Sequence, residues 1–288
     1  MAPSVAATIM VARSVAAVGE NPLVRKITFT GSEAAGQIVY EAGAKRIVPV
    51  SLELGGKSPM IICADATLDK TVTGAIAGMR FTRQGQSCTA ASRIYVHEDL
   101  FDAFMARITE ALEGLVIGDP MDPDTSFGPM VSKRQMEIAL GYVEKGKAEG
   151  ARLVYGGAAI DRDGFYMQPT VFADVTDDMS IAREEIFGPV MSVLDFETEA
   201  EVMARANATE FGLAAGVFTK DLSRAHRVAA GFEAGTCYIN TYNDAPVEAP
   251  FGGMKNSGVG RENSKAAIDH YSQLKTVYVR MGDMEAPF

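Results

Sequence analysis

The thiol of Cys88 is the first side chain in this sequence that could do covalent chemistry on a carbonyl group. It lies in the segment GQSCT (85–89), where the glycine lets the backbone turn sharply and present the sulfur atom. A thiolate attacks a carbonyl carbon well because sulfur is soft and ionises near neutral pH. A lone cysteine is more often a small core residue, so this segment alone leaves both interpretations open.

Glu53 is the second such side chain. It ends the apolar segment IVPVSLEL (47–54) and precedes two glycines. A carboxylate at the end of a buried strand can lie at a cleft with a raised pKa and take a proton from water. An ordinary strand-end glutamate before a Gly-Gly turn fits the same residues.

Two further segments could bind a cofactor. FTGS (29–32) ends an expected strand and opens an expected helix, and the N–H groups of a helix N-terminus suit a pyrophosphate. EEIFGP (184–189) sets two carboxylates beside an aromatic ring, which could contact a ribose and a flat heterocycle. Taken singly, both are typical of connecting turns.

The elements that must position these residues alternate between strand-like and helix-like patterns, which predicts an α/β fold with a mostly parallel sheet. Strands are expected at 26–30, 47–54, 60–63, 93–97, 152–155, 191–196, 216–219 and 275–281. Helices are expected at 1–19, 33–44, 68–81, 100–115, 132–149, 200–208 and 222–230. The last strand is remote from the others in sequence, so we expect it to join the sheet of another subunit in a homo-oligomer.

Composition excludes several classes of protein. The net charge of −10 and the pI of about 4.9 disfavour a nucleic-acid partner, because an acidic surface repels phosphates. No run of about 18 apolar residues is free of charges or helix breakers, which excludes a membrane span. The three cysteines match neither a disulfide framework nor a zinc pattern. They fit a reducing compartment, so we expect a cytoplasmic protein.

Four segments in order, VSLELGGKSP, GQSCTAASR, REEIFGPV and APFGGMKNSGVGRE, resemble the aldehyde dehydrogenase superfamily from about residue 21 to the end. The segment FGLAAG (211–216), the segment SGVGREN (257–263) and the closing VYVRMGDMEAPF look most like its betaine aldehyde dehydrogenase branch. The resemblance implies a catalytic domain of that family, the remnant of a Rossmann-type domain and a C-terminal oligomerisation strand. The remnant of the dinucleotide-binding domain is expected at 1–54, the catalytic domain at 55–256, and the C-terminal helix and oligomerisation strand at 257–288.

The resemblance also implies roles for single residues. Cys88 is expected to be the nucleophile, Glu53 the base that activates water, and Glu262 part of a charge relay. Lys255 and Gly258 are expected to offer backbone carbonyls to a potassium ion. The residues expected to bind NAD or NADP are Gly31 and Ser32 at the pyrophosphate, Leu54 and Gly55 near the nicotinamide, and Glu185 and Phe187 at its ribose.

The implied reaction is oxidation of a small-molecule aldehyde to a carboxylate through a Cys88 thiohemiacetal and thioester. Betaine aldehyde is the expected substrate, and Tyr242 could face its quaternary ammonium by cation–π attraction or be a loop aromatic. An aminoaldehyde or a semialdehyde is the nearest alternative. The family has a longer N-terminal region that carries an oxyanion-hole asparagine and most of the cofactor domain. We therefore also keep an impaired fragment acting as an oligomerisation module, and a cofactor-free thioesterase.

Overall fold

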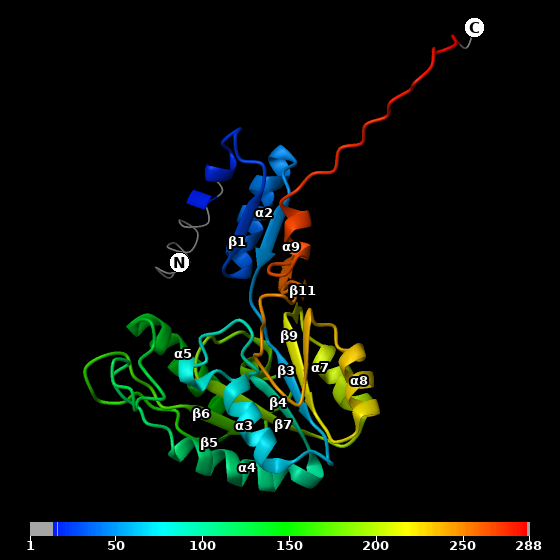
Figure 1. The fold of residues 1–288 in the computed structure, drawn as a ribbon. Helices are drawn as coiled ribbons and strands as arrows, with labels where there is room; N and C mark the ends of the chain where they lie inside the picture. Colours follow the sequence, from blue (N-terminus) through cyan, green and yellow to red (C-terminus); the bar gives the residue numbers. More distant parts are fainter. Residues whose placement is uncertain (1–13, 16, 287–288) are drawn as a thin grey trace.

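The described residues form a three-stranded sheet in an upper lobe and a seven-stranded sheet in a lower lobe, together with a two-stranded sheet (Figure 1). The computed structural model describes residues 14, 15 and 17–286. The helix expected at 1–19 therefore lies largely outside the described residues. The α/β prediction is confirmed.

The larger sheet has seven strands, and every neighbouring pair is parallel except β5 with β6. Its strand order is β10 (Thr236–Ile239), β9 (Ala214–Phe218), β3 (Pro59–Ile62), β4 (Arg93–His97), β7 (Val190–Phe196), β6 (Thr170–Ala173) and β5 (Arg152–Tyr155). The expected strands at 60–63, 93–97, 152–155, 191–196 and 216–219 are all present, each within about two residues. β6 and β10 were not predicted.

Helices cover both faces of this sheet, because alternate residues of each central strand point to opposite sides. On β3, Met60 and Ile62 belong to one hydrophobic cluster and Ile61 to the other. The first cluster contains side chains of α3 (Leu68–Gly78) and α4 (Glu98–Glu113). The second contains side chains of α5 (Lys133–Ala148), α6 (Ser180–Arg183), α7 (Glu199–Asn207) and α8 (Leu222–Gly231). None of the helices that the described residues form is long and apolar enough for a membrane crossing.

The smaller sheet joins segments from both ends of the chain. β1 (Ile27–Thr30) pairs in parallel with β2 (Val50–Glu53), and β12 (Gly258–Val259) pairs antiparallel with β2. Helix α2 (Glu33–Arg46) packs on this sheet through Val39 and begins at Ser32, whose side chain accepts a hydrogen bond from the N–H of Ala35. The sheet therefore brings the FTGS turn (29–32) and Glu53 close to the last motif, which is the segment APFGGMKNSGVGRE (249–262).

Short elements complete the described part of the fold. They are the 3₁₀ helix η1 (Phe81–Arg83), the strands β8 (Phe211–Gly212) and β11 (Met254–Lys255), and the helix α9 (Ala266–His270). The segment 275–281 extends away from both lobes and pairs with no strand in the described chain (Figure 1). Its strand is not confirmed, because a terminal strand needs a partner sheet and none of the described sheets receives it.

Candidate active site

The predicted catalytic residues meet where the two sheets adjoin. Glu53 is the last residue of β2, and the chain then crosses to the larger sheet, where β3 begins at Pro59. Cys88 lies in the loop that leads into β4, and Glu185 lies in the loop that leads into β7. The site therefore lies between the carboxyl end of the small sheet and the amino ends of three strands of the large one.

The loop that presents Cys88 is held by close backbone contacts. A Cβ atom on Gly56 would overlap the carbonyl oxygen of Cys88, so the Gly-Gly turn after Glu53 packs directly against the Cys88 loop. Gly85 has φ +64°, and a Cβ there would overlap the carbonyl of Gly188. Both glycines are needed because a larger residue would push these loops apart.

The side chain of Asn243, in the segment that follows β10, also forms hydrogen bonds to the Cys88 loop. Its side-chain nitrogen donates to the carbonyls of Ala77 at 2.8 Å and Gly78 at 3.2 Å, at the end of α3. Its side-chain oxygen accepts a 2.8 Å hydrogen bond from the hydroxyl of Thr89, the residue after Cys88. Asn243 therefore links the end of α3 to the residue that follows Cys88.

Burial raises the pKa of the Cys88 thiol, and the nearby carboxylates of Glu185 and Glu53 raise this pKa further. The backbone N–H groups of Cys88 and Thr89 point at the sulfur and act in the opposite direction. The thiol thus rests mainly in its neutral form, within reach of two backbone donors. Such donors can also stabilise an oxyanion that forms on a carbonyl carbon bound to this sulfur.

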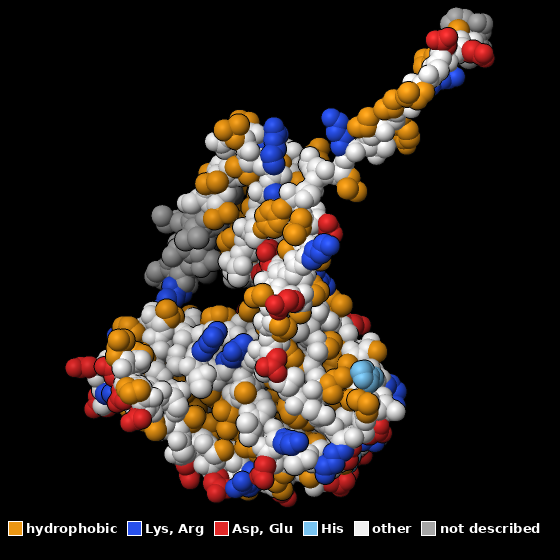
Figure 2. Space-filling model, viewed as in Figure 1, with side chains coloured by type: hydrophobic (Ala, Val, Ile, Leu, Met, Phe, Trp, Pro, Cys, Tyr) orange, Lys and Arg blue, Asp and Glu red, His pale blue; other side chains and the backbone are white. Residues whose placement is uncertain are grey.

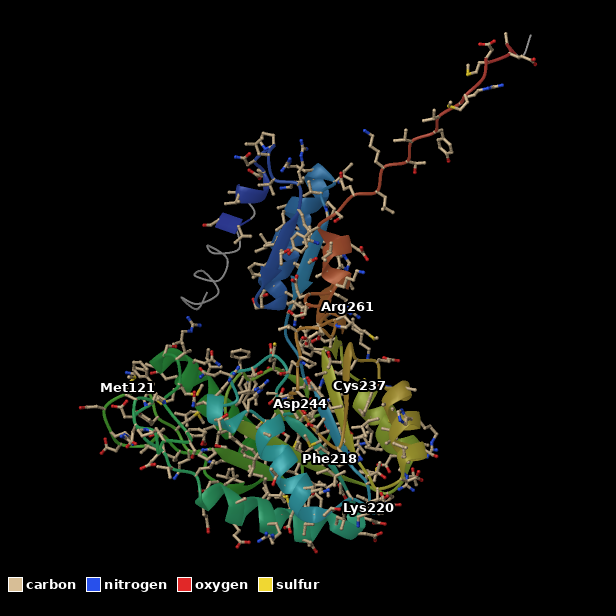
Figure 3. The ribbon with its side chains drawn as sticks, in the orientation of Figure 1. Met121, Phe218, Lys220, Cys237, Asp244 and Arg261 are labelled. Carbon is tan, nitrogen blue, oxygen red and sulfur yellow. The ribbon has the colours of Figure 1, made fainter. Side chains whose placement is uncertain are left out.

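Glu53 has the properties of a general base. Burial raises the pKa of its carboxyl to about 7, with a further rise from Glu262, and the guanidinium of Arg261 acts against both. One carboxyl oxygen of Glu53 is buried without a hydrogen-bond partner in the described chain. Arg261 lies where the two lobes join (Figure 3). A carboxyl with a pKa near neutrality can accept a proton from water at physiological pH.

Glu262 lies close enough to Glu53 to influence its protonation. Its backbone forms a bridge with Phe251, and one of its carboxyl oxygens is buried without a partner in the described chain. Burial lowers the pKa of Lys26, and Glu262 acts in the opposite direction. Glu53, Glu262 and Lys26 thus form one electrostatically coupled group beside β2.

The last motif holds the turn after Glu53 in place. The hydroxyl of Ser257 donates to the carbonyl of Gly55 at 2.6 Å and accepts from the N–H of Gly212 at 2.9 Å. The carbonyl of Ser257 accepts from the N–H of Leu54 at 2.9 Å. Gly258 then runs so close to β2 that a Cβ would overlap the carbonyl of Leu52. This packing explains the small residues of the motif.

Glu185 lies directly against the Gly-Gly turn. One of its carboxyl oxygens accepts a 3.0 Å hydrogen bond from the N–H of Gly56, and a Cβ on Gly55 would overlap the other. The pKa of Glu185 is raised by burial, against which the Gly56 hydrogen bond and Lys57 act. Lys57 itself is 1% exposed, and burial lowers its pKa to about 7. A small cavity lined by Gly56, Glu185 and Phe187 opens beside the Cys88 loop.

The residues expected at the pyrophosphate lie at the start of α2. Ser32 caps the helix, and its hydroxyl hydrogen is free to donate because the oxygen is the acceptor in the cap. The N–H of Gly31 donates to the carbonyl of Glu53 at 3.0 Å, which links this turn to the catalytic strand. The N–H of Gly31 is therefore already paired within the chain, and Gly31 serves as a turn residue before α2.

Tyr242 lies inside the core of the larger lobe. It is 6% exposed, its ring lies 4.6 Å from that of Tyr238 between centroids, and a Cβ on Gly216 would come within 2.7 Å of it. A buried ring offers no open face to a quaternary ammonium, so this packing does not support the aromatic-cage interpretation. The observed contacts favour a packing role.

The side chain of Lys255, one of the two residues expected at a potassium ion, is held by protein partners. The ammonium of Lys255 donates to the carbonyls of Asn207 at 2.7 Å and Thr209 at 3.1 Å and pairs with Glu233. Among the described residues, no group of three or more His, Cys, Asp or Glu side chains could hold a metal ion. Potassium binding through backbone carbonyls remains a prediction.

Sequence reasoning missed several residues that build this site. Lys57 and Ser257 lie inside recognised motifs, but their hydrogen bonds and charge partners are far away in sequence. Asn243 carried no signal, because its partners at Ala77 and Thr89 are remote in the chain. Arg261, which directly follows the glycines of the last motif, could have been suspected from its position before Glu262.

Comparisons with known proteins agree with this geometry. Residues 5–277 match the model of the aldehyde dehydrogenase family. A betaine aldehyde dehydrogenase from Sinorhizobium fredii is 60% identical over 271 residues, which cover 93% of this chain and 55% of that protein. Betaine aldehyde dehydrogenase 1 from Rhizobium meliloti is 57% identical over the same shares of both chains.

Solved structures show the same fold. An aldehyde dehydrogenase from Bacillus cereus in complex with NAD⁺ matches with a TM-score of 0.90 and 43% identity, covering 93% of this chain and 54% of that one. A betaine aldehyde dehydrogenase from Staphylococcus aureus in complex with NAD⁺ matches with a TM-score of 0.86 and 36% identity, covering 89% and 51%. The chain spans about half the length of the relatives it matches, and it belongs to the aldehyde dehydrogenase family.

Proposed function

We propose that this chain carries the thiol half of an NAD(P)-dependent aldehyde dehydrogenase, with Cys88 as nucleophile and Glu53 as general base. One observation supports this most strongly. The Cys88 thiol lies beside two buried carboxyls, one of which has a pKa of about 7 and an oxygen without a partner in the described chain. A packing cysteine needs no such neighbours.

The residues present fit the nicotinamide half of a dinucleotide. Glu185 is held against the Gly55–Gly56 turn by its hydrogen bond from the N–H of Gly56, and Phe187, 40% exposed, supplies an apolar surface beside Glu185 in the same cavity. In the proposal, Glu185 accepts hydrogen bonds from the ribose hydroxyls, and Ser32 with the first turn of α2 receives the pyrophosphate. When bound, the cofactor supplies an acceptor for a hydride.

The chain's own residues account for the remaining steps. The Cys88 thiolate adds to the aldehyde carbon, and the N–H groups near the sulfur hold the resulting oxygen anion. Loss of hydride from this thiohemiacetal leaves a thioester on Cys88. Glu53 takes a proton from water, the hydroxide adds to the thioester, and the carboxylate product leaves with return of the thiol. Burial, with a further contribution from the Glu262 carboxylate, raises the pKa of Glu53 to about 7, which suits this proton transfer.

The substrate proposal begins with betaine aldehyde, because relatives that are 57–60% identical are named for it. A semialdehyde, which carries a negative charge, is the second candidate. It is favoured by the burial of Tyr242, which leaves no open aromatic face for a quaternary ammonium. The relatives with bound NAD⁺ support NAD as cofactor, with NADP as the alternative.

We also propose that the chain forms a homo-oligomer through its C-terminal segment. Leu274, Tyr278 and Met281 are each more than nine-tenths exposed, and Figure 2 shows hydrophobic side chains along this extension. An extended apolar segment of this kind can add a strand to a sheet of a second copy.

In this proposal the domains are 1–54, 55–256 and 257–288, and β12 links the last to the first. The free cysteines support a cytoplasmic location.

The test is NADH formation by the purified chain with a panel of neutral, cationic and anionic aldehydes. We expect oxidation that Cys88→Ala abolishes and that Cys237→Ala leaves unchanged, because Cys237 is exposed and lies on β10, which is not among the three strands that border the site. Oxidation at the parent rate by Cys88→Ala would refute the nucleophile assignment. Ester hydrolysis by Cys88 without any oxidation would instead identify a thioesterase.

A further inference from the structure

The two residues that flank Cys88 are joined to each other by their hydroxyls. The hydroxyl oxygens of Ser87 and Thr89 lie 3.1 Å apart, and Thr89 is 6% exposed. The single hydroxyl proton of Thr89 goes to the side-chain oxygen of Asn243 at 2.8 Å, so the proton between the two hydroxyls comes from Ser87. Ser87, Thr89 and Asn243 therefore form one directed chain of hydrogen bonds that spans Cys88.

The other end of the Asn243 side chain is held by α3. Its amide nitrogen donates to the carbonyls of Ala77 and Gly78, and the Gly78 carbonyl also accepts from the N–H of Ala91 at 2.9 Å. The helix ends at Gly78 with one face in the larger core, and the chain turns at Arg80 with a φ of +56°. Asn243 and the exit of the Cys88 loop are thus tied to the same carbonyl.

The backbone conformation and the bonding pattern at position 243 together select asparagine. Asn243 has a φ of +65°, a left-handed conformation that glycine, asparagine and aspartate adopt most readily. Glycine has no side chain to bond, and an ionised aspartate only accepts, so it could not bind the two carbonyls of α3. Asparagine alone of the three can donate to α3 and accept from Thr89 at once.

We propose that Asn243 is a positioning residue for Cys88, which fixes the sulfur atom and the backbone N–H groups beside it by holding Ser87 and Thr89 against α3. This inference rests on the proposed role of Cys88 as nucleophile. The N–H groups of Cys88 and Thr89 lower the pKa of the thiol, against burial and the nearby carboxylates. A Thr89 that is released from Asn243 would carry one of these donors away from the sulfur.

The first experiment follows the reactivity of Cys88 without any turnover. Iodoacetamide alkylates a thiolate, which forms a carbon–sulfur bond and displaces iodide, and peptide mass spectrometry gives the rate at each cysteine between pH 6 and pH 10. Asn243→Gly keeps the left-handed backbone and removes the amide. It should slow alkylation of Cys88 at pH 8 about threefold to tenfold and move the pH profile upward, because the donors that favour the thiolate are less firmly held.

The other two cysteines are references within the same sample. Cys237 is exposed and reports the reagent, while Cys63 is buried and reports unfolding. Both rates should stay within about twofold of the parent values in Asn243→Gly. Alkylation of Cys88 that is unchanged or faster, with Cys63 still protected, would overturn the inference.

Asn240→Gly is the matched control. Asn240 also has a positive φ, +54°, and its amide also forms two hydrogen bonds, one from the N–H of Thr219 at 3.0 Å and one to the Thr219 carbonyl at 2.9 Å. These bonds fasten the loop after β9 and not the Cys88 loop. Asn240→Gly should leave the rate and pH profile of Cys88 within about twofold of the parent, and an equal change in both variants would refute a specific role of Asn243.

Variants at Thr89 test the same link from its other end. Thr89→Val removes the hydroxyl and nearly keeps the shape, so it should slow Cys88 by a similar factor. Because both residues act through one hydrogen bond, Asn243→Gly combined with Thr89→Val should be no slower than the slower single variant. Thr89→Ser keeps the hydroxyl and should stay within about twofold of the parent. Multiplied effects in the double variant would contradict the link, and Thr89→Val decides the question if Asn243→Gly does not fold.

The second experiment measures NADH formation with an aldehyde that the parent chain oxidises. Asn243→Gly should lower the single-turnover rate of Cys88 acylation about threefold to tenfold and leave KM for NAD within about twofold, because Asn243 acts on the thiol and not on the residues proposed to bind the cofactor. Alkylation that depends on Asn243 in a chain that oxidises no aldehyde would refute the proposed function alone. Aldehyde oxidation with alkylation and acylation that ignore Asn243 would refute this inference alone.

Discussion

Replacing Glu53 by glutamine tests, through stability alone, the protonation state of the carboxyl that we propose as the general base. The pKa of Glu53 is about 7 in the folded chain and 4.5 in an unfolded one, so folding opposes its ionisation. The difference of 2.5 units (7 minus 4.5) corresponds to roughly 3 kcal/mol, at about 1.4 kcal/mol per unit. The stability of the parent chain should fall by this order of magnitude between pH 4.5 and pH 7. Glu53→Gln carries no charge and should escape this loss.

The assay is urea unfolding of both chains at pH 4.5, 6 and 8. We expect equal stabilities at pH 4.5 and an advantage of about 2–3 kcal/mol for Glu53→Gln at pH 8. The matched control is Glu248→Gln, which removes the same type of side-chain charge from an exposed position. A Glu53→Gln chain that is no more stable than the parent at pH 8 would mean that Glu53 is not held in a charge-disfavouring environment.

Three further predictions concern the groups around Glu53 and Cys88. Hydrolysis of an acyl group from Cys88, measured in single-turnover experiments, should accelerate as pH rises through about 7, because only ionised Glu53 accepts a proton. Glu262→Gln removes the like charge that raises the Glu53 pKa, so it should move this midpoint to lower pH; an unmoved midpoint would contradict the coupling. Ser257→Ala leaves the carbonyl of Gly55 and the N–H of Gly212 without their partner, and it should lower stability by about 1–3 kcal/mol in urea unfolding and weaken NAD binding in a fluorescence titration.

The elements that carry the motifs could be predicted because their signals are local. β3 and β4 are short apolar runs, and α5 is capped at its N-terminus by Ser132 and is followed by Gly150, so periodicity and capping residues define them. β6 and β10 escaped because they have four residues each with no alternation to mark them. The end of α3 was placed too late, because the left-handed turn at Arg80 is set by contacts with the Cys88 loop.

The composition of the site could be predicted only in part. The residue types at Cys88 and Glu53 indicated their chemistry, but their mutual approach depends on how the two sheets adjoin. The hydrogen bond from the hydroxyl of Ser257 to the carbonyl of Gly55 joins residues 202 positions apart, and no local sequence pattern predicts such a contact. Tyr242 lies in a segment that reads as a loop in the sequence, but in the structure its ring is a core residue. Gly78 and Gly216 leave the space that the ring fills, and neither contact could be seen from the local sequence.

The central claim is that Cys88 carries the acyl group and Glu53 releases it. Its most direct test is mass spectrometry of Glu53→Gln after mixing with NAD and an aldehyde that the parent chain oxidises. We predict a thioester on Cys88, with the mass of the substrate acyl group, that accumulates in Glu53→Gln and disappears within seconds in the parent chain. An adduct on Cys63 or Cys237, or NADH formation with no adduct on any cysteine, would contradict the account.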